Sequence, residues 1–187
     1  MMLKYISNLF YRISNTWLAA ISFLIFLIFM ALVLPQQSAS AETYSGGAGS
    51  PDTSLFYTPN ELYSMAESYG ASGRLAYINA RFTFDLIFPF VYGFFLTALI
   101  SWLGKRVFQQ TSRLKFINLF PPIGMIFDFL ENISASIVMA QYPSSADLAA
   151  SLAPAFTFIK WIFVGGSFAL LFGLSISLII MKIKKER

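Results

Sequence analysis

Four apolar stretches, each long enough to cross a lipid bilayer, constrain the fold of this chain more than any other feature. They cover residues 17–35, 82–104, 116–141 and 155–181. Crossing about 30 Å of hydrocarbon as an α-helix takes about 20 residues. A helix pairs its own backbone polar groups, whereas an open strand in lipid leaves them unpaired. The pattern therefore predicts an all-α polytopic membrane protein: a four-helix transmembrane bundle forming a single membrane domain over residues 1–187.

Composition excludes several other classes of protein. Only 12% of the residues are charged and 57% are hydrophobic, whereas soluble domains carry roughly 25% charged residues. The chain contains no Cys and no His, which excludes thiol chemistry, zinc held by Cys or His, and Ser-His-Asp catalysis. We therefore expect no metal site and no cofactor, and proton chemistry would have to use carboxylates, Lys or Tyr.

The positions of the basic residues predict the orientation of the spans. Ten of the 13 Lys and Arg residues lie before span one, between spans two and three, or after span four: Lys4, Arg12, Lys105, Arg106, Arg113, Lys115, Lys182, Lys184, Lys185 and Arg187. Basic residues near spans stay on the cytoplasmic side. We therefore expect a multi-pass protein of the bacterial plasma (inner) membrane with both termini in the cytoplasm. Its basic charge indicates the lipid bilayer as partner, and no nucleic acid.

The first span has two interpretations. Residues 17–34 are free of charge and follow a basic segment, and Ala39-Ser40-Ala41 has the small residues of a signal-peptide cleavage site. The apolar run is nevertheless longer than the roughly 7–15 residues usual for signal peptides. A retained anchor is therefore favoured, with cleavage as the alternative, which would leave three spans in unchanged orientation.

The predicted outer loop, residues 36–81, contains one clear helix signal. A helix cap, a first-position proline and a capping-box glutamate occur in order at Thr58, Pro59 and Glu61. Gly70 is a natural stop, and residues 45–51 have the composition of a flexible linker. The pattern predicts a short amphipathic helix that lies on the membrane interface or roofs the bundle. A second helix is expected to begin after Ser72 and to run directly into span two.

Ionisable residues inside the spans provide the candidate site. Each costs at least about 2.5 kcal/mol to insert, so it indicates function by default. On span three, Asp128, Glu131 and Asn132 share one helix face because they are three and four residues apart. We expect spans two, three and four to enclose a polar cleft that opens outwards. Its candidate ligand-binding residues are Arg81, Asp85, Tyr92, Asp128, Glu131, Asn132 and Lys160.

A structural role is the alternative for some of these charges. Lys160 can pair with Asp85 or Glu131, and Arg81 with Asp85, so that the pairs hold the helices together. For Asp128 and Glu131 a functional role is favoured, because two acids one turn apart at depth repel each other. Further along span four, residues 165–166 are both Gly, which predicts a close helix approach there.

One extended pattern supports a family resemblance. The sequence Tyr77-x-x-x-Arg81-x-x-x-Asp85-x-x-x-Pro89-x-x-Tyr92-Gly93, followed by residues 127–132 with Asp128, Glu131 and Asn132, resembles bacterial four-span integral membrane proteins without an assigned activity. The resemblance covers spans two to four. It implies a membrane bundle and brings no activity with it.

Three functions remain open from the sequence. The first is binding or transport, in which the acidic cleft holds a cation, a proton or a lipid head group. The second is an assembly or accessory subunit that meets a membrane-protein partner or a second copy of the chain. The third, ranked below these, is a membrane-embedded lipid-modifying enzyme with Asp128 and Glu131 as acid and base or as ligands of Mg²⁺. No catalytic residue is assigned.

Overall fold

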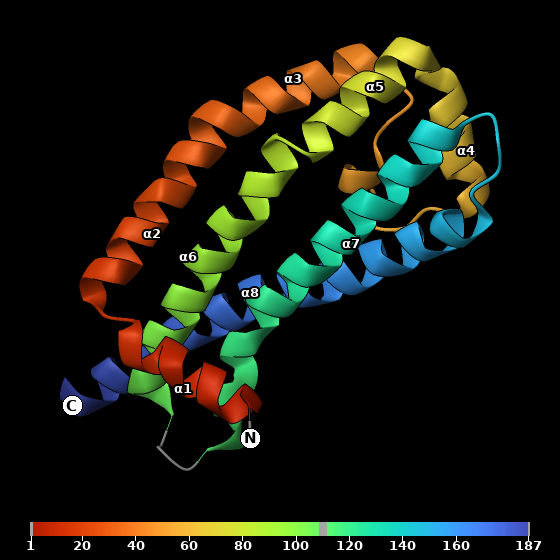
Figure 1. Cartoon of the computed structure of the whole chain (residues 1–187). Helices are drawn as coiled ribbons and strands as arrows, with labels where there is room; N and C mark the ends of the chain where they lie inside the picture. The colour runs from red at the N-terminus through yellow and green to blue at the C-terminus, as the bar shows by residue number, and fades with distance from the viewer. Residues whose placement is uncertain (1, 109–111, 187) are drawn as a thin grey trace.

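The computed structural model describes residues 2–108 and 112–186, and this part of the chain contains helices and turns but no strand. Four of its helical segments are long and apolar enough to cross a membrane: Thr16–Ser45, Gly70–Val107, Leu114–Gln141 and Asp147–Glu186. They run side by side along the length of the molecule (Figure 1). The all-helical prediction with four candidate spans is therefore confirmed for the described residues.

The first long helix extends beyond its predicted end. It consists of α2 (Thr16–Ile28), the π-helical turn η1 (Phe29–Val33) and α3 (Leu34–Ser45). The prediction that residues 36–45 belong to a loop is wrong. Pro35 lacks an N–H group and would break a regular α-helix, but the π turn shifts the hydrogen-bond pattern just before it, and the Leu34 N–H bonds to the Phe29 carbonyl.

The end of the molecule opposite the termini is closed by a helical cap. A segment with the short 3-10 turn η2 (Pro51–Thr53) leads to α4 (Pro59–Ser68) and α5 (Gly70–Arg81). The predicted capping box is confirmed, because the Thr58 hydroxyl accepts from the Glu61 N–H (3.3 Å) and the Glu61 carboxylate accepts from the Thr58 N–H (2.7 Å). Gly70 has φ +62°, which stops α4 and turns the chain into α5.

The cap has its own buried core. Apolar and tyrosine side chains of α4, α5 and the preceding segment pack against the adjoining ends of α7 (Phe120–Gln141) and α8 (Asp147–Glu186). These core residues are Tyr57, Leu62, Ala66, Tyr69, Tyr77, Ala135, Val138, Met139, Ala150 and Ala153. Helix α4 therefore roofs the bundle, the second of the two placements expected for it.

The second long helix is interrupted next to the candidate site. Helix α5 begins at Gly70, not after Ser72, and turn residues 82–83 separate it from α6 (Phe84–Val107). The expectation of one uninterrupted helix is wrong at this point. Thr83 leaves the helical region at φ −121° and ψ −80°, and its hydroxyl donates to the Asn79 carbonyl at 2.7 Å, competing with the backbone.

Helices α7 and α8 pack closely, and of the two predicted glycines Gly166 lies at their contact, where an added Cβ would be 3.5 Å from the Phe120 ring. A Cβ atom on Gly124 of α7 would lie 2.8 Å from Val164 Cγ2, so the helices approach each other there. A Cβ on Gly165 would meet nothing within 4 Å, which makes the predicted close approach wrong at that residue.

The helices that correspond to predicted spans three and four differ in length from the prediction. Span three is helical from α7 onwards after the 3-10 segment η3 (Arg113–Leu119), and α8 is longer than 155–181.

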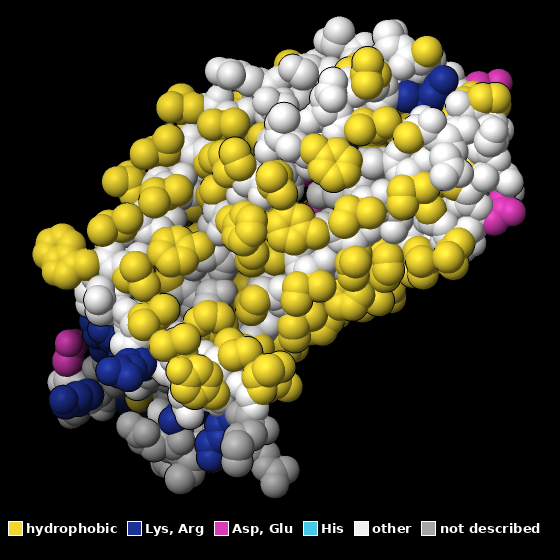
Figure 2. All heavy atoms as spheres, in the orientation of Figure 1, with side chains coloured by type: hydrophobic (Ala, Val, Ile, Leu, Met, Phe, Trp, Pro, Cys, Tyr) yellow, Lys and Arg dark blue, Asp and Glu magenta, His cyan; other side chains and the backbone are white. Residues whose placement is uncertain are grey.

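The end with both termini carries the basic residues and a helix that was not predicted. Helix α1 (Met2–Ile13) lies across this end of the bundle (Figure 1). Most of the Lys and Arg side chains visible in Figure 2 gather there, beside some acidic atoms, while the opposite end shows both acidic and basic side chains. Arg187 and the side chain of Arg113 lie outside what the structure describes. The other basic residues of the predicted cytoplasmic set lie on α1, at the end of α6, on η3 and at the end of α8.

Candidate functional site

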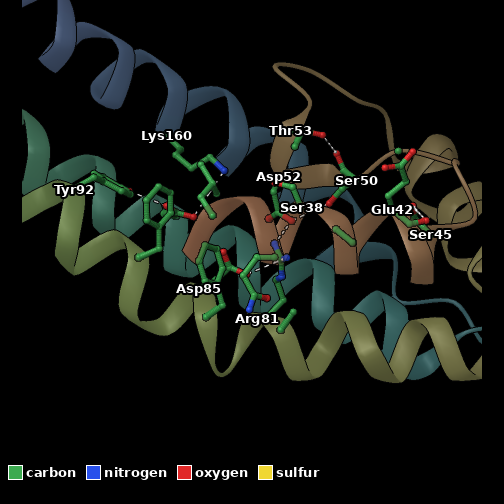
Figure 3. Close-up of a pocket in the computed structure, with 18 of the residues that line it drawn as sticks. Ser38, Glu42, Ser45, Ser50, Asp52, Thr53, Arg81, Asp85, Tyr92 and Lys160 are labelled. Carbon is green, nitrogen blue, oxygen red and sulfur yellow. Dashed lines mark hydrogen bonds and ion pairs between the residues drawn. The ribbon is translucent and has the colours of Figure 1, made fainter. Parts of the chain in front are cut away.

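A cavity of about 720 Å³ lies between the first long helix, the segment 47–53, α6 and α8. In Figure 3 the labelled side chains from these elements point towards one another across it. The sequence predicted a cleft enclosed by spans two, three and four. The structure places the first long helix and the segment after it on the cavity wall as well, so this cavity has two walls that the sequence did not indicate.

Charged and apolar side chains both line the cavity, and we call these two sets its charged (ionic) part and its apolar part. The charged part consists of Glu42, Asp52, Arg81, Asp85, Asp128 and Lys160. The apolar part includes Phe26, Met30, Phe84, Phe88, Val164 and Phe168. Four carboxylates thus accompany two cations, and the apolar side chains are of the kind that accepts hydrocarbon.

Lys160 occupies the centre of the charged part. Its ammonium lies 2.5 Å from Glu131 Oε2 and 3.7 Å from Asp128 Oδ1. Lys160 is 5% exposed and Glu131 is not exposed at all. Opposite charges that are removed from water need such close partners. Lys160 therefore links α8 to two acids of α7. The sequence predicted the pairing with Glu131 as one of two possibilities but did not predict the pairing with Asp128.

Asp128 has neutral hydrogen-bond donors in addition to Lys160. The hydroxyl of Tyr92 on α6 donates to Asp128 Oδ2 at 2.7 Å. The amide of Asn132, one helical turn further along α7, donates to Asp128 Oδ1 at 3.4 Å. Asp128 thus connects α6, α7 and α8 while its side chain remains 13% exposed towards the cavity.

Arg81 forms a second ionic group beside the helix break. Its guanidinium pairs with Asp52 of η2 and, at 2.9 Å, with Asp85 one turn along the chain. The guanidinium also stacks 4.5 Å from the centroid of the Tyr77 ring. The break at residues 82–83 turns α5 relative to α6 between the two paired residues. The segment 46–58 is thereby attached to the bundle at the cavity wall.

Several buried polar atoms near these pairs lack a partner. Glu131 Oε1, Asn132 Oδ1 and the hydroxyls of Tyr44 and Tyr77 accept or donate no hydrogen bond among the described residues. Buried polar groups are normally satisfied. The orientation of the Asn132 amide follows from its neighbour, because a carboxylate only accepts hydrogen bonds and so faces the amide nitrogen. Arg81 Nε is likewise a buried donor without an acceptor among the described residues, so the unpaired atoms include both donors and acceptors.

The cap side of the cluster is closed by a tyrosine. The Tyr57 hydroxyl lies 3.1 Å from Thr157 Oγ1 of α8, and both side chains are buried. Burial raises the pKa of the Tyr57 phenol, and the negative charge of Glu131 raises this pKa further. Tyr57 is therefore protonated at neutral pH and acts as a neutral hydrogen-bonding group.

The structure brings the seven predicted site residues into two groups, each held together by its own ion pairs and hydrogen bonds. Lys160, Asp128, Glu131, Asn132 and Tyr92 form one group. The second group contains Arg81 and Asp85. Five of the seven line the cavity, whereas Glu131 and Asn132 lie behind its wall.

The sequence did not indicate the residues contributed from outside spans two to four. These are Glu42 and Tyr44 on α3 and Asp52 on η2. Within span four, Trp161 also lines the cavity, and its indole N–H donates to the Ser54 carbonyl at 3.1 Å. Asp52 follows Ser50-Pro51 in a glycine-rich segment. Local sequence carried no periodic signal for it, because its partner Arg81 is distant in the chain.

Within the described residues no group of three or more acidic side chains is arranged to hold a metal ion. Comparisons with protein-family models, curated proteins and solved structures returned no match to this chain. The function is therefore inferred from the chemistry of the cavity, which can hold a charged group at one part and hydrocarbon at the other.

Proposed function

We propose that this protein is a membrane-embedded binding protein that holds an amphipathic molecule, such as a lipid, in the cavity beside the first long helix. The observation that carries this proposal is that ionic and apolar side chains line the same cavity. A polar head group fits beside Arg81, Asp85, Asp128 and Lys160, and its chain fits along the phenylalanine side chains.

The size and position of the cavity support this function. Small-molecule sites typically enclose about 300–1,000 Å³ and combine apolar walls with a few placed polar groups; the volume here is about 720 Å³. Four helical segments are long and apolar enough to cross a membrane. Under this proposal the cavity lies among membrane-spanning helices, where amphipathic molecules are abundant.

We further propose that the cap faces the outer side of a bacterial inner membrane and that both termini are cytoplasmic. The gathering of Lys and Arg at the end with the termini supports this orientation (Figure 2). The chain lacks Cys, so single introduced cysteines report cleanly. With a membrane-impermeant maleimide added to intact cells, we expect labelling of Ser68→Cys on α4 and none of Lys184→Cys. The reverse pattern contradicts the orientation.

The binding function is tested by filling the cavity. Ala41 of α3 lines the cavity, whereas Ala39 on the same helix is exposed and does not line it. We expect Ala41→Trp to lower the amount of amphipathic molecule that remains with the protein after purification in mild detergent, measured by native mass spectrometry. Ala39→Trp is the matched control. Equal occupancy in both variants, or no bound molecule in the unmodified protein even after lipid is added back, rejects the proposal.

An accessory role is a second candidate, favoured by exposed apolar side chains at the cap. Leu55 is 67% exposed, Phe56 69% and Leu148 76%. Such residues suit contact with another membrane protein. Replacing Leu55 and Phe56 by Ser is expected to remove a partner that co-purifies with the unmodified chain, whereas retention of that partner in the variant rejects this surface as the contact.

A further inference from the structure

We propose that the head group bound in the cavity is cationic, an ammonium group, and that Asp128 is its counter-ion. This inference rests on the proposed binding function and adds the chemical class of the ligand. It follows from two features of the ionic part: its charge and the pairing of Asp128.

The charge of the cavity wall is negative. Glu42, Asp52, Asp85 and Asp128 face it, against the two cations Arg81 and Lys160. Each cation already lies between two carboxylates, with Glu131 behind the wall as the second acid of Lys160. An anionic head group would have to displace one of these carboxylates from its cation. A cationic head group meets an excess of negative charge that is weakly screened away from water.

Asp128 is the carboxylate best placed to receive this charge. Lys160 lies 2.5 Å from Glu131 but 3.7 Å from Asp128, so its charge is directed mainly at Glu131. The remaining partners of Asp128, Tyr92 and Asn132, are neutral. Asp128 also lines the cavity, whereas Glu131 does not. Asp128, the acid that a ligand in the cavity can reach, is thus also the acid whose negative charge is less fully neutralised by Lys160.

The hydrogen-bonding capacity of an ammonium group suits the accessible carboxylate. An ammonium group supplies three donors and no acceptor, and the cavity-lining carboxylate of Asp128 only accepts hydrogen bonds. A phosphate or carboxylate group would bring further acceptors to Asp128. An amine therefore complements Asp128 better than an anion does.

The apolar wall provides a matching place for a chain. The rings of Phe26, Phe88 and Phe168 also line the cavity, and Phe88 lies between Asp85 and Tyr92 along α6. Phe26 and Phe88 come from different long helices, so a single alkyl chain contacts both as it leaves the head-group region. Trp161 also lines the cavity and its indole reports the occupancy of the space beside Lys160.

The experiment compares head groups on a constant chain. In the full chain, Trp17→Phe and Trp102→Phe leave Trp161 as the single tryptophan, since the sequence has three. The protein in neutral detergent is titrated with hexadecylamine, hexadecanol and hexadecyl phosphate at pH 7, where the amine is protonated, and Trp161 fluorescence is recorded. We expect the amine to bind at least about tenfold more tightly than the alcohol, a ratio equivalent to about 1.4 kcal/mol, and the phosphate to bind most weakly.

A variant assigns the effect to Asp128. In Asp128→Asn the preference for the amine over the alcohol is expected to disappear, whereas Asp147→Asn at the start of α8, outside the cavity, retains it. Tightest binding of the phosphate, or an unchanged amine preference in a folded Asp128→Asn, overturns the cationic assignment but leaves the binding function intact. If none of the three compounds binds, the binding function itself fails. The order of the three head groups in the unsubstituted cavity decides the assignment even if Asp128→Asn does not fold.

Discussion

Lys160 Nζ lies 2.5 Å from Glu131 Oε2, and the Glu131 side chain has no surface exposed to solvent. This pair joins helices α7 and α8, which pack closely against each other, at the wall of the cavity. It explains how an acid can be kept in an apolar bundle: the nearby ammonium offsets the loss of water. It also leaves Asp128, on the cavity side, as the acid with mostly neutral partners.

Removing one member of this pair is expected to cost more than removing both. Lys160→Met leaves Glu131 as a buried charge without its closest partner and should lower the free energy of unfolding by about 3–5 kcal/mol. In the double variant Lys160→Met/Glu131→Met, much of this loss should be recovered, because the fully buried acid is gone and Asp128 keeps its hydrogen bonds from Tyr92 and Asn132. The free energies of unfolding of the unmodified protein, the two single variants and the double variant form a double-mutant cycle. They are measured by circular dichroism as sodium dodecyl sulfate is added to the protein in detergent. Strictly additive losses would show that the two residues do not depend on each other.

Helix packing gives a second prediction, with a control on the neighbouring helix. Gly124→Ala adds a Cβ atom that would lie 2.8 Å from Val164 Cγ2, so α7 and α8 must move apart. We expect a loss of about 1–3 kcal/mol in the free energy of unfolding, as for overpacked cores. Gly165→Ala meets no atom within 4 Å and should leave stability unchanged or raise it. Equal effects of the two substitutions on the same unfolding curve would argue against the observed packing.

The capping box predicts a pH dependence of the cap. Hydrogen bonds from the backbone N–H and the hydroxyl of Thr58 hold the pKa of the Glu61 carboxyl below its usual value. The carboxylate therefore stabilises α4 at pH values above the pKa of an unfolded Glu, about 4.3. This stabilisation is lost as the pH falls through the lower, folded-state pKa. Hydrogen exchange of the amides of residues 59–68 between pH 6 and pH 3 should show α4 opening more readily at the acid end.

A matched substitution isolates this effect from general acid destabilisation. Glu61→Gln should remove most of the pH dependence of α4 opening, since Gln does not titrate. Glu67→Gln, at the other end of the same helix, should retain it. If the two variants show the same dependence, another group controls the cap.

Local signals were sufficient for part of this fold and insufficient for the cavity. The capping box at Thr58 depends on neighbours within one helical turn, so its sequence pattern predicted it. The helical spacing of Asp128, Glu131 and Asn132 likewise predicted a shared polar face. The wall formed by α3 and η2 depends on pairing between Asp52 and Arg81, residues far apart in sequence, and no local period records such a pairing.

At the end with the termini, a buried asparagine is predicted to hold α1 in place. The Asn118 amide donates to the Ser7 carbonyl (3.0 Å) and to Ser101 Oγ (3.1 Å), and its carbonyl accepts from the Ser7 hydroxyl (2.8 Å). Asn118→Ala leaves these groups unpaired and should cost about 1–3 kcal/mol. Cleavage of α1 by added protease should accelerate in this variant. Asn8→Ala, at an exposed position of α1, is expected to be cleaved like the unmodified protein, and faster cleavage there would contradict the assignment.

The pairing of Asp52 with Arg81 is predicted to keep the segment 46–58 closed over the cavity. Asp52 lies on η2 and Arg81 at the end of α5, and the pair is only partly exposed. Asp52→Asn removes the charge while keeping the side-chain size. Because a partly exposed ion pair contributes about 1 kcal/mol, the open population of the segment should rise about fivefold.

Cysteine labelling measures this opening, since the chain has no Cys of its own. Ser45→Cys places the probe at a position that is 4% exposed, at the end of α3 beside the segment. Its labelling by a maleimide should be about fivefold faster when Asp52→Asn is added, in proportion to the open population. Ser38→Cys, on the same helix and already exposed, should react at the same rate with or without Asp52→Asn. An unchanged rate at position 45 would mean that packing of Tyr57 and η2, and not this ion pair, keeps the cavity closed.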